Sequence, residues 1–238
     1  MKPLVLITND DGYFSPGIVE LARAAGEHWR VVVVAPDQNR SAIGRCLSLE
    51  MPIRVREIGD WRFAISGTPV DCVCYGLGSL LRAGTPSLIL SGINIGANLG
   101  TDVLSSGTVA AAIEGHMRGI PSIAISQHEK GNYEAAAALA VSMGHKLIKS
   151  GHPALLNINV PGDVFTETRN TRLGKRVYDY SIAEETDPRG KPYFWIGGSS
   201  IQMVGGEGTD CQAIMDGCAS VTPLQIDLTD YKTWLSGL

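Results

Sequence analysis

Two adjacent acids near the start of the chain are the side chains in this sequence most capable of chemistry. Asp10 and Asp11 follow Asn9, shortly after the apolar run 4–7. Such a run is typical of a buried strand, and in parallel sheets ligands bind where strands end. Neighbouring carboxylates repel each other and are costly to bury unless a cation lies with them. We therefore predict a divalent metal here; the alternative is a loop in which Asp11 caps the next helix.

Three later loops offer further oxygen ligands. Each follows an apolar run, so parallel strands would bring all of them to the sheet edge that holds Asp10. They contain, in chain order, Asn39, Arg40 and Ser41, then Asn94 and Asn98, then Ser105, Ser106, Gly107 and Thr108. Carboxylate, hydroxyl and amide oxygens suit hard cations such as Mg²⁺ or Mn²⁺. None of these loops contains His or Cys, which argues against zinc.

The last of these loops adds a means of binding an anion. It leads into an Ala-rich helix predicted over 109–117, and helix N-termini favour anions through their free N–H groups and the helix dipole. A metal beside such a helix start indicates phosphate chemistry. Arg40 is a candidate for a charge-assisted contact to a phosphate oxygen, although a lone arginine is more commonly a solvated surface charge.

The sequence lacks the signatures of several other enzyme classes. It contains no GxxxxGK[ST] phosphate loop, no GxGxxG dinucleotide fingerprint and no GxSxG nucleophile elbow. Asn-Asp-Asp at 9–11 is not the Asp-x-Asp of haloacid-dehalogenase-type phosphatases. Two other classes stay open: a Rossmann-type oxidoreductase, which the missing fingerprint opposes, and a nucleotide sensor that binds without hydrolysing.

Composition narrows the possible partners. The 238 residues carry a net charge of −4 and no basic block, so no nucleic-acid polymer is expected as a partner. No apolar run is long enough to span a bilayer, and a strand starting by residue 4 leaves no room for a signal peptide. The five cysteines form no CxxC pair. We expect reduced thiols and a cytoplasmic protein without a membrane partner.

The elements that must position these loops alternate between strand and helix. Buried strands are predicted at 4–7, 31–36, 87–90, 120–126 and 154–160, with weaker antiparallel strands within 47–66. Helices are predicted at 18–25, 69–82 (with Thr68 as its N-cap), 109–117 and 133–149. This rhythm predicts a doubly wound, Rossmann-like α/β fold with a mostly parallel sheet. We assign residues 1–165 to this catalytic core.

From about residue 163 the alternation of strands and helices ends. Aromatic, strand-like segments at 172–180 and 192–196 flank a turn at 187–190, and a last strand is predicted at 219–228. We interpret residues 166–238 as a hairpin and C-terminal extension packed on the core. A lone hairpin is hard to stabilise, so we expect this arm to pair with a second subunit. The alternative is an arm folded back on its own core.

Several motifs in these segments together resemble the SurE family of survival-protein nucleotidases. They are collinear and span almost the whole chain: Thr8-Asn9-Asp10-Asp11-Gly12, Asn39-Arg40-Ser41, Gly67-Thr68-Pro69-Val70-Asp71-Cys72, Ser91-Gly92-Ile93-Asn94-Ile95-Gly96-Ala97-Asn98-Leu99-Gly100, Ser106-Gly107-Thr108-Val109-Ala110-Ala111-Ala112, Asp187-Pro188-Arg189-Gly190, Gly208-Thr209-Asp210 and Val221-Thr222-Pro223-Leu224. The combination is highly specific.

The resemblance implies a metal-dependent phosphatase that hydrolyses nucleoside 5′- and 3′-monophosphates and sometimes short polyphosphate. It also implies cytoplasmic homodimers or tetramers built through the C-terminal arm. Carried over by motif position, one Mg²⁺ or Mn²⁺ per subunit is held by Asp10, Asp11, Ser41 and Asn94. The phosphate is expected to contact Asn9, Asn98, Ser106, Gly107 and Thr108, with Asn39 and Arg40 beside them.

The hypothesis for the reaction is attack of a metal-activated water on phosphorus. Asp10 and Asp11 hold the ion, and Asp11 is the better candidate for general base. Asn98 and backbone N–H groups near Gly107 and Thr108 stabilise the equatorial oxygens of the transition state. A covalent aspartyl-phosphate formed on Asp10 is the rival route.

Overall fold

A nine-stranded sheet forms the centre of the molecule. The structure is a computed structural model that describes residues 2–82, 84–197, 201–231 and 233. The strand order is β3-β4-β2-β1-β5-β6-β7-β13-β8. The strands are β1 Leu4–Thr8, β2 Arg30–Pro36, β3 Val55–Gly59, β4 Arg62–Ile65, β5 Leu88–Ile95, β6 Ser122–Gln127, β7 Leu155–Val160, β8 Thr168–Asn170 and β13 Ala219–Pro223. All neighbouring pairs are parallel except β3–β4 and β7–β13. The predicted doubly wound, mostly parallel fold is confirmed.

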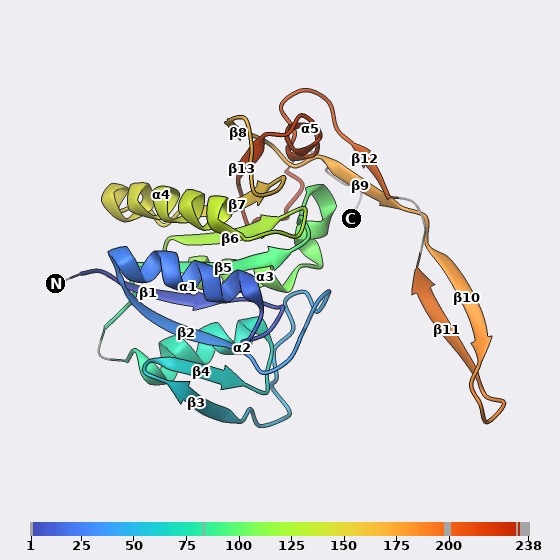
Figure 1. The fold of residues 1–238 in the computed structure, drawn as a ribbon, viewed down its shortest axis with the longest axis horizontal. Helices are drawn as coiled ribbons and strands as arrows, with labels where there is room; N and C mark the ends of the chain where they lie inside the picture. Colours follow the sequence, from blue (N-terminus) through green and yellow to red (C-terminus); the bar gives the residue numbers. More distant parts are fainter. Residues whose placement is uncertain (1, 83, 198–200, 232, 234–238) are drawn as a thin grey trace.

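Helices cover both faces of this sheet (Figure 1). The α-helices are α1 Pro16–His28, α2 Pro69–Tyr75, α3 Gly107–Met117, α4 Glu134–Ser150 and α5 Asp210–Met215, with a π-turn η1 Gly76–Leu80 and a 3-10 turn η2 Gly100–Leu104. Among the described residues, no helix is both long and apolar enough to cross a membrane.

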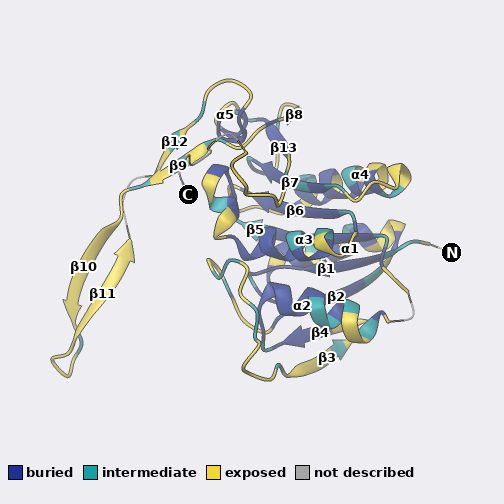
Figure 2. Cartoon of the chain, turned by 180° about the vertical axis from the view of Figure 1, so that it is seen from behind, coloured by how far each residue is buried: buried dark blue, intermediate teal, exposed yellow. Residues whose placement is uncertain are grey.

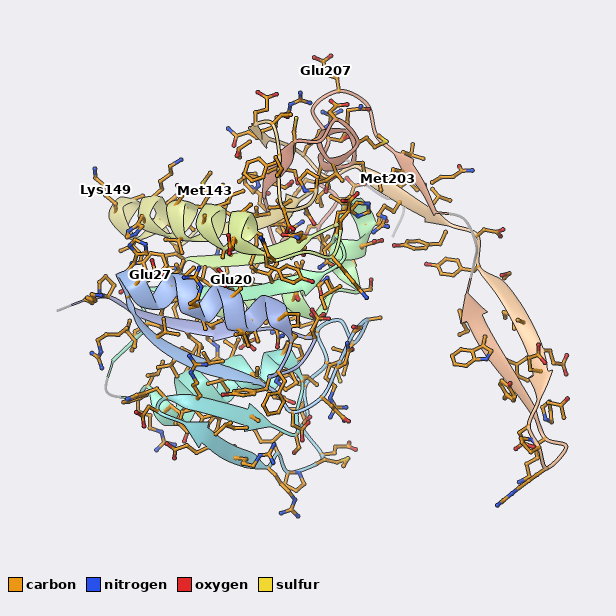
Figure 3. All side chains as sticks on the ribbon, in the orientation of Figure 1. Glu20, Glu27, Met143, Lys149, Met203 and Glu207 are labelled. Carbon is orange, nitrogen blue, oxygen red and sulfur yellow. The ribbon has the colours of Figure 1, made fainter. Side chains whose placement is uncertain are left out.

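Two apolar cores, one on each face, explain why β1 and β2 are apolar at nearly every position. Val5 and Ile7 of β1 pack in one core with α1 and α4, whereas Leu6 between them packs in the other with α2 and α3. Successive side chains of a strand point to opposite faces, so a strand covered on both sides needs apolar residues at every position. On the outer surface of α1, Glu20 and Glu27 (Figure 3) flank Arg23 and form ion pairs with it.

The start of α2 is determined by residues that are close together in the sequence. Thr68 is its N-cap and accepts a hydrogen bond from the Asp71 N–H at 3.1 Å, while Asp71 Oδ2 accepts from the Thr68 N–H at 2.9 Å. Pro69 occupies the first helical position. This reciprocal capping box fixes the predicted helix start. The end of the helix differs from the prediction, which placed it at residue 82. The α-helix ends at Tyr75, and the chain continues as the π-turn η1.

The C-terminal segment forms the predicted hairpin. Two antiparallel pairs, β9 Lys175–Tyr178 with β12 Ile201–Val204 and β10 Ser181–Thr186 with β11 Pro192–Gly197, make an arm that leaves the core (Figure 1). Every residue of β10 and β11 is exposed (Figure 2). After the arm the chain returns to the core, where β13 joins the main sheet between β7 and β8, the short strand that precedes the arm. The division into 1–165 and 166–238 stays a prediction.

Several elements differ from the predictions. The stretch from residue 91, expected to be loop, continues β5 to Ile95 through a bulge, because Gly92 adopts a φ of 139° that favours glycine and Asn94 pairs with Ser126 of β6. The last strand, predicted to reach residue 228, ends at Pro223. Three short elements, β8, β12 and α5, lack a strong sequence pattern and are not among the predicted elements.

Candidate active site

The loop after β1 holds its polar residues in a buried, hydrogen-bonded turn. Asn9 is fully buried, and its Nδ2 donates to Gly12 O at 2.9 Å and to Ser15 Oγ at 2.8 Å. Gly12 has a φ of 98°, and a Cβ there would lie 3.1 Å from the backbone of Gln38. The glycine therefore allows this loop to pack against the loop that follows β2.

Asp10 is locked against the start of α3. Its Oδ1 accepts from Thr108 Oγ1 at 2.5 Å and its Oδ2 accepts from the Thr108 N–H at 3.1 Å. The carboxylate is 3% exposed. A Cβ at Gly107 would lie 2.9 Å from Asp10 Cβ, so the helix can approach this closely only with glycine there. The Thr108 N–H, expected to face a phosphate, is therefore committed to Asp10.

The two neighbouring acids are electrostatically unfavourable as charged groups. Burial raises the pKa of Asp10 by more than its hydrogen bonds to Thr108 lower it. Burial likewise raises the pKa of Asp11 to about 6; the Ile95 N–H, which donates to Asp11 Oδ2 at 2.9 Å, opposes the rise, and the charge of Asp10 adds to it. A cation between the two carboxylates would relieve both effects.

The loop after β2 brings Ser41 to the site and turns Arg40 away from it. The Arg40 N–H donates to Asp10 O at 2.7 Å, which ties this loop to the first. The Ser41 N–H donates to Asn39 Oδ1 at 2.8 Å. The Arg40 guanidinium lies 3.5 Å from Ser66 O and, with the Gln38 amide turned to offer its oxygen, 2.9 Å from that oxygen. In this arrangement it is not a wall of the pocket described below.

A buried amide network fixes Asn98. Asn159 of β7 clamps its backbone from both sides: Oδ1 accepts from the Asn98 N–H at 2.8 Å and Nδ2 donates to Asn98 O at 3.1 Å. Asn157 Nδ2 also donates to Asn98 O, at 2.8 Å. The Asn98 side chain donates to Ser126 Oγ at 2.9 Å. Two strands, β6 and β7, thus set the position of one amide side chain.

A small pocket of about 180 Å³ lies where these loops meet, on the side of the sheet toward which β1, β5 and β6 point in Figure 1. Its walls are Asp10, Ser41, Ala42, Asn94, Ile95, Asn98, Asp102, Ser105, Ser106 and Tyr178. The pocket therefore unites five of the predicted site residues from four separate loops. Asn9, Asp11, Asn39, Gly107 and Thr108 belong to the same loops but are not part of its walls. The roles assigned to all of them stay predictions.

Two polar wall residues, Asp102 and Tyr178, were not predicted as site residues. Asp102 lies in the polar segment before α3, where nothing in the local sequence singles it out. Tyr178 belongs to β9 of the arm and reaches the site only through tertiary packing. The aromatic residues near the predicted turn indicate a hairpin arm, but nothing in the sequence indicates that Tyr178 contacts the pocket.

The donor set fits a hard divalent cation. Within the ranges that the structure describes, no three His, Cys, Asp or Glu side chains are grouped to hold a metal. A metal here would therefore rely on Asp10 and Asp11, supplemented by hydroxyl and amide oxygens from Ser41 and Asn94. An all-oxygen set of this kind is what Mg²⁺ and Mn²⁺ accept.

The fold and the pocket together define a class: a doubly wound α/β protein with a polar ligand site at the carboxyl edge of its sheet. The sequence model of the family described as "Survival protein SurE" matches residues 5–180. A 5′-nucleotidase SurE of Pelobacter propionicus is 47% identical to this chain, covering 96% of each, and one of Aquifex aeolicus is 44% identical, covering 98% of this chain and 96% of its own. The crystal structure of a SurE protein from Aquifex aeolicus superposes with a TM-score of 0.82 at 42% identity, covering 97% of this chain and 96% of that one.

The chain therefore belongs to the SurE family. The resemblance drawn from its motifs is confirmed, and the name its relatives share, 5′-nucleotidase, is that of a phosphoric monoester hydrolase.

Proposed function

We propose that this chain hydrolyses nucleoside 5′-monophosphates, and also 3′-monophosphates and short polyphosphate, with one Mg²⁺ or Mn²⁺ per subunit. The observation that carries the proposal is the pocket itself. It places the predicted metal ligands Asp10, Ser41 and Asn94 beside the predicted phosphate contacts Asn98 and Ser106 in a space of about 180 Å³. That space suits a phosphate group, and the relatives' shared name supports the same reaction.

The metal, held by Asp10, Asp11, Ser41 and Asn94, would supply Lewis-acid chemistry: neutralised charge on the phosphoryl group and a lowered pKa for the attacking water. Asp11 accepts the water's proton, with its carboxyl group oriented by the Ile95 N–H. Asn98 donates to an equatorial phosphate oxygen from a backbone fixed by Asn159. Ser106, whose Oγ caps α3 through the Val109 N–H at 3.1 Å, holds the helix start beside the phosphate.

The hydrogen bonds of Asp10 favour attack by water over a covalent aspartyl-phosphate. A nucleophilic carboxylate needs an oxygen free to approach phosphorus in line. Both Asp10 oxygens accept hydrogen bonds from Thr108, and the side chain is almost fully buried. Each oxygen keeps a second lone pair that a metal ion can use, but a carboxylate fixed and buried in this way cannot turn toward phosphorus, so Asp10 is assigned the role of a fixed ligand.

The arm supports a proposal about assembly. We infer that two or four copies associate through β10 and β11, whose exposed apolar side chains include Ile182, Phe194, Trp195 and Ile196. An arm with such a surface is better stabilised by a second copy than by water. All five cysteines are free, which agrees with the proposed cytoplasmic location.

Phosphate release tests the proposed reaction. We expect the purified protein to release phosphate from a panel of nucleoside 5′- and 3′-monophosphates in the presence of Mn²⁺ or Mg²⁺. A chelator should remove the activity and excess metal should restore it. Binding of nucleotides without phosphate release would identify a sensor, and a spectroscopic change on titration with a nicotinamide cofactor would identify an oxidoreductase; either result would overturn the proposal.

A further inference from the structure

A second, larger pocket opens directly beside the candidate phosphate pocket. It measures about 630 Å³ and shares four wall residues with the smaller one: Ala42, Asp102, Ser105 and Tyr178. Pockets for small organic ligands generally measure a few hundred Å³ or more. The smaller pocket accepts a phosphate group but is too small for a nucleoside. A nucleotide whose phosphate lies there must therefore extend its remaining atoms across the shared wall into the larger pocket.

Part of the wall of the larger pocket is aromatic and aliphatic, beside the charged side chains of Lys175 and Arg176. The rings of Tyr178 and Tyr180 are stacked, with centroids 5.7 Å apart and an interplanar angle of 27°. Tyr180 is 73% exposed, and Leu104 of η2, another wall of the same pocket, is 69% exposed. Exposed apolar surface gathered in a concave site is a signature of ligand binding. A flat, largely apolar ligand would cover both surfaces.

A partly buried ion pair holds this aromatic wall to the phosphate loop. Arg176 Nη1 donates to Asp102 Oδ2 at 2.5 Å, and the Tyr178 hydroxyl donates to the same oxygen. The Asp102 carbonyl oxygen accepts the N–H groups of Ser105 and Ser106, both at 3.1 Å. Asp102 therefore connects the N-cap of α3, beside the candidate phosphate pocket, to Tyr178 in the larger pocket. The positions of the phosphate and of the tyrosine rings are set by the same short segment.

We propose that Tyr178, Tyr180 and Leu104 form the nucleoside subsite, in which the base of the substrate stacks on the tyrosine rings. This inference rests on the proposed nucleotidase function. Every base has a π-face, so stacking accepts all of them, and the subsite predicts hydrolysis of purine and pyrimidine nucleotides alike. It also gives the base of the arm a role in each active site that is separate from assembly.

Substitution of Tyr180 tests the subsite. The measurement is the ratio of kcat/KM for a nucleoside 5′-monophosphate to kcat/KM for ribose 5-phosphate, which lacks a base, both with Mn²⁺. We expect Tyr180→Ala to lower this ratio about tenfold, the loss expected from removing one base–aromatic stack. Tyr180→Phe keeps the ring and should keep the ratio. Tyr231→Ala, which removes a similarly exposed tyrosine (78%) outside the pocket, is the matched control.

Calorimetric binding of adenosine provides a readout that does not depend on turnover. Adenosine should bind the wild type and bind Tyr180→Ala about tenfold more weakly. If the wild type releases no phosphate from any substrate but adenosine binding weakens in this way, the proposed function fails and the subsite stands. If the wild type is an active nucleotidase and Tyr180→Ala changes neither the ratio nor adenosine binding, the subsite is wrong and the function stands.

Discussion

The two walls of the candidate active site are built on opposite principles. On the core side, Asp10 is 3% exposed and both of its carboxylate oxygens are engaged by Thr108. On the arm side, Tyr180 is 73% exposed and packs on Tyr178. Burial and hydrogen bonds give the core side one geometry, as phosphoryl transfer requires. The exposed arm side can accept ligands of different shape. We therefore expect core substitutions to abolish chemistry and arm substitutions to change selectivity or assembly.

Replacing Asp10 by Asn should have the largest effect. The substitution preserves shape and one acceptor for Thr108 but removes a negative charge at the centre of the proposed metal set. We expect kcat with Mn²⁺ to fall by about 10³-fold or more, at the upper end for loss of one preorganised electrostatic group. Thermal unfolding by circular dichroism should stay close to wild type. The control is Asp37→Asn, an exposed acid just past the end of β2 and outside the pocket walls.

A variant Asp10→Asn that hydrolyses nucleoside monophosphates at the wild-type rate would remove the assigned role of Asp10. It would also remove the contrast between the two walls, because the buried side would then be no more critical than the exposed one.

Substitution of Asn159 tests whether its hydrogen bonds to the Asn98 backbone are needed to position the Asn98 side chain. Asn159→Ala removes both hydrogen bonds that clamp the Asn98 backbone and leaves the Asn98 N–H buried without that partner. We expect a loss of about 1–3 kcal/mol of stability and a fall in kcat of about tenfold with a smaller change in KM. Kinetics and denaturant unfolding measure the two effects separately.

Asn157→Ala is the matched comparison for this prediction. Asn157 is equally buried on the same strand but donates only to Asn98 O, which also accepts from Asn159. Its loss should lower kcat less than the loss of Asn159. Equal effects of the two variants on kcat would mean that the network stabilises the fold without positioning Asn98.

The same contrast between walls explains what the sequence could predict. Residues of the core wall follow buried strands, and the apolar run before Asp10 or the Thr68–Asp71 capping box can be recognised within a few residues. Convergence of the loops then follows from parallel strand topology. The orientation of Arg40 toward Ser66 and the commitment of the Thr108 N–H to Asp10 depend on contacts 26 and 98 residues apart. The place of Tyr178 in the pocket depends on its contact with Asp102, 76 residues away. No local sequence pattern indicates contacts between residues so far apart in the chain.

The outer hairpin of the arm, formed by β10 and β11, should give the smallest effect on chemistry. Trp195 is 66% exposed on β11 and is not among the walls of either pocket described above. Replacing an exposed apolar side chain by serine changes the stability of a monomer by about 0.5 kcal/mol or less. We expect Trp195→Ser to leave kcat/KM for ribose 5-phosphate within about twofold of wild type while shifting the oligomer toward smaller species in analytical ultracentrifugation. Loss of activity without a change in assembly would contradict the contrast between the two walls. A substitution on the arm and outside both pockets would then affect chemistry as substitutions in the core wall do.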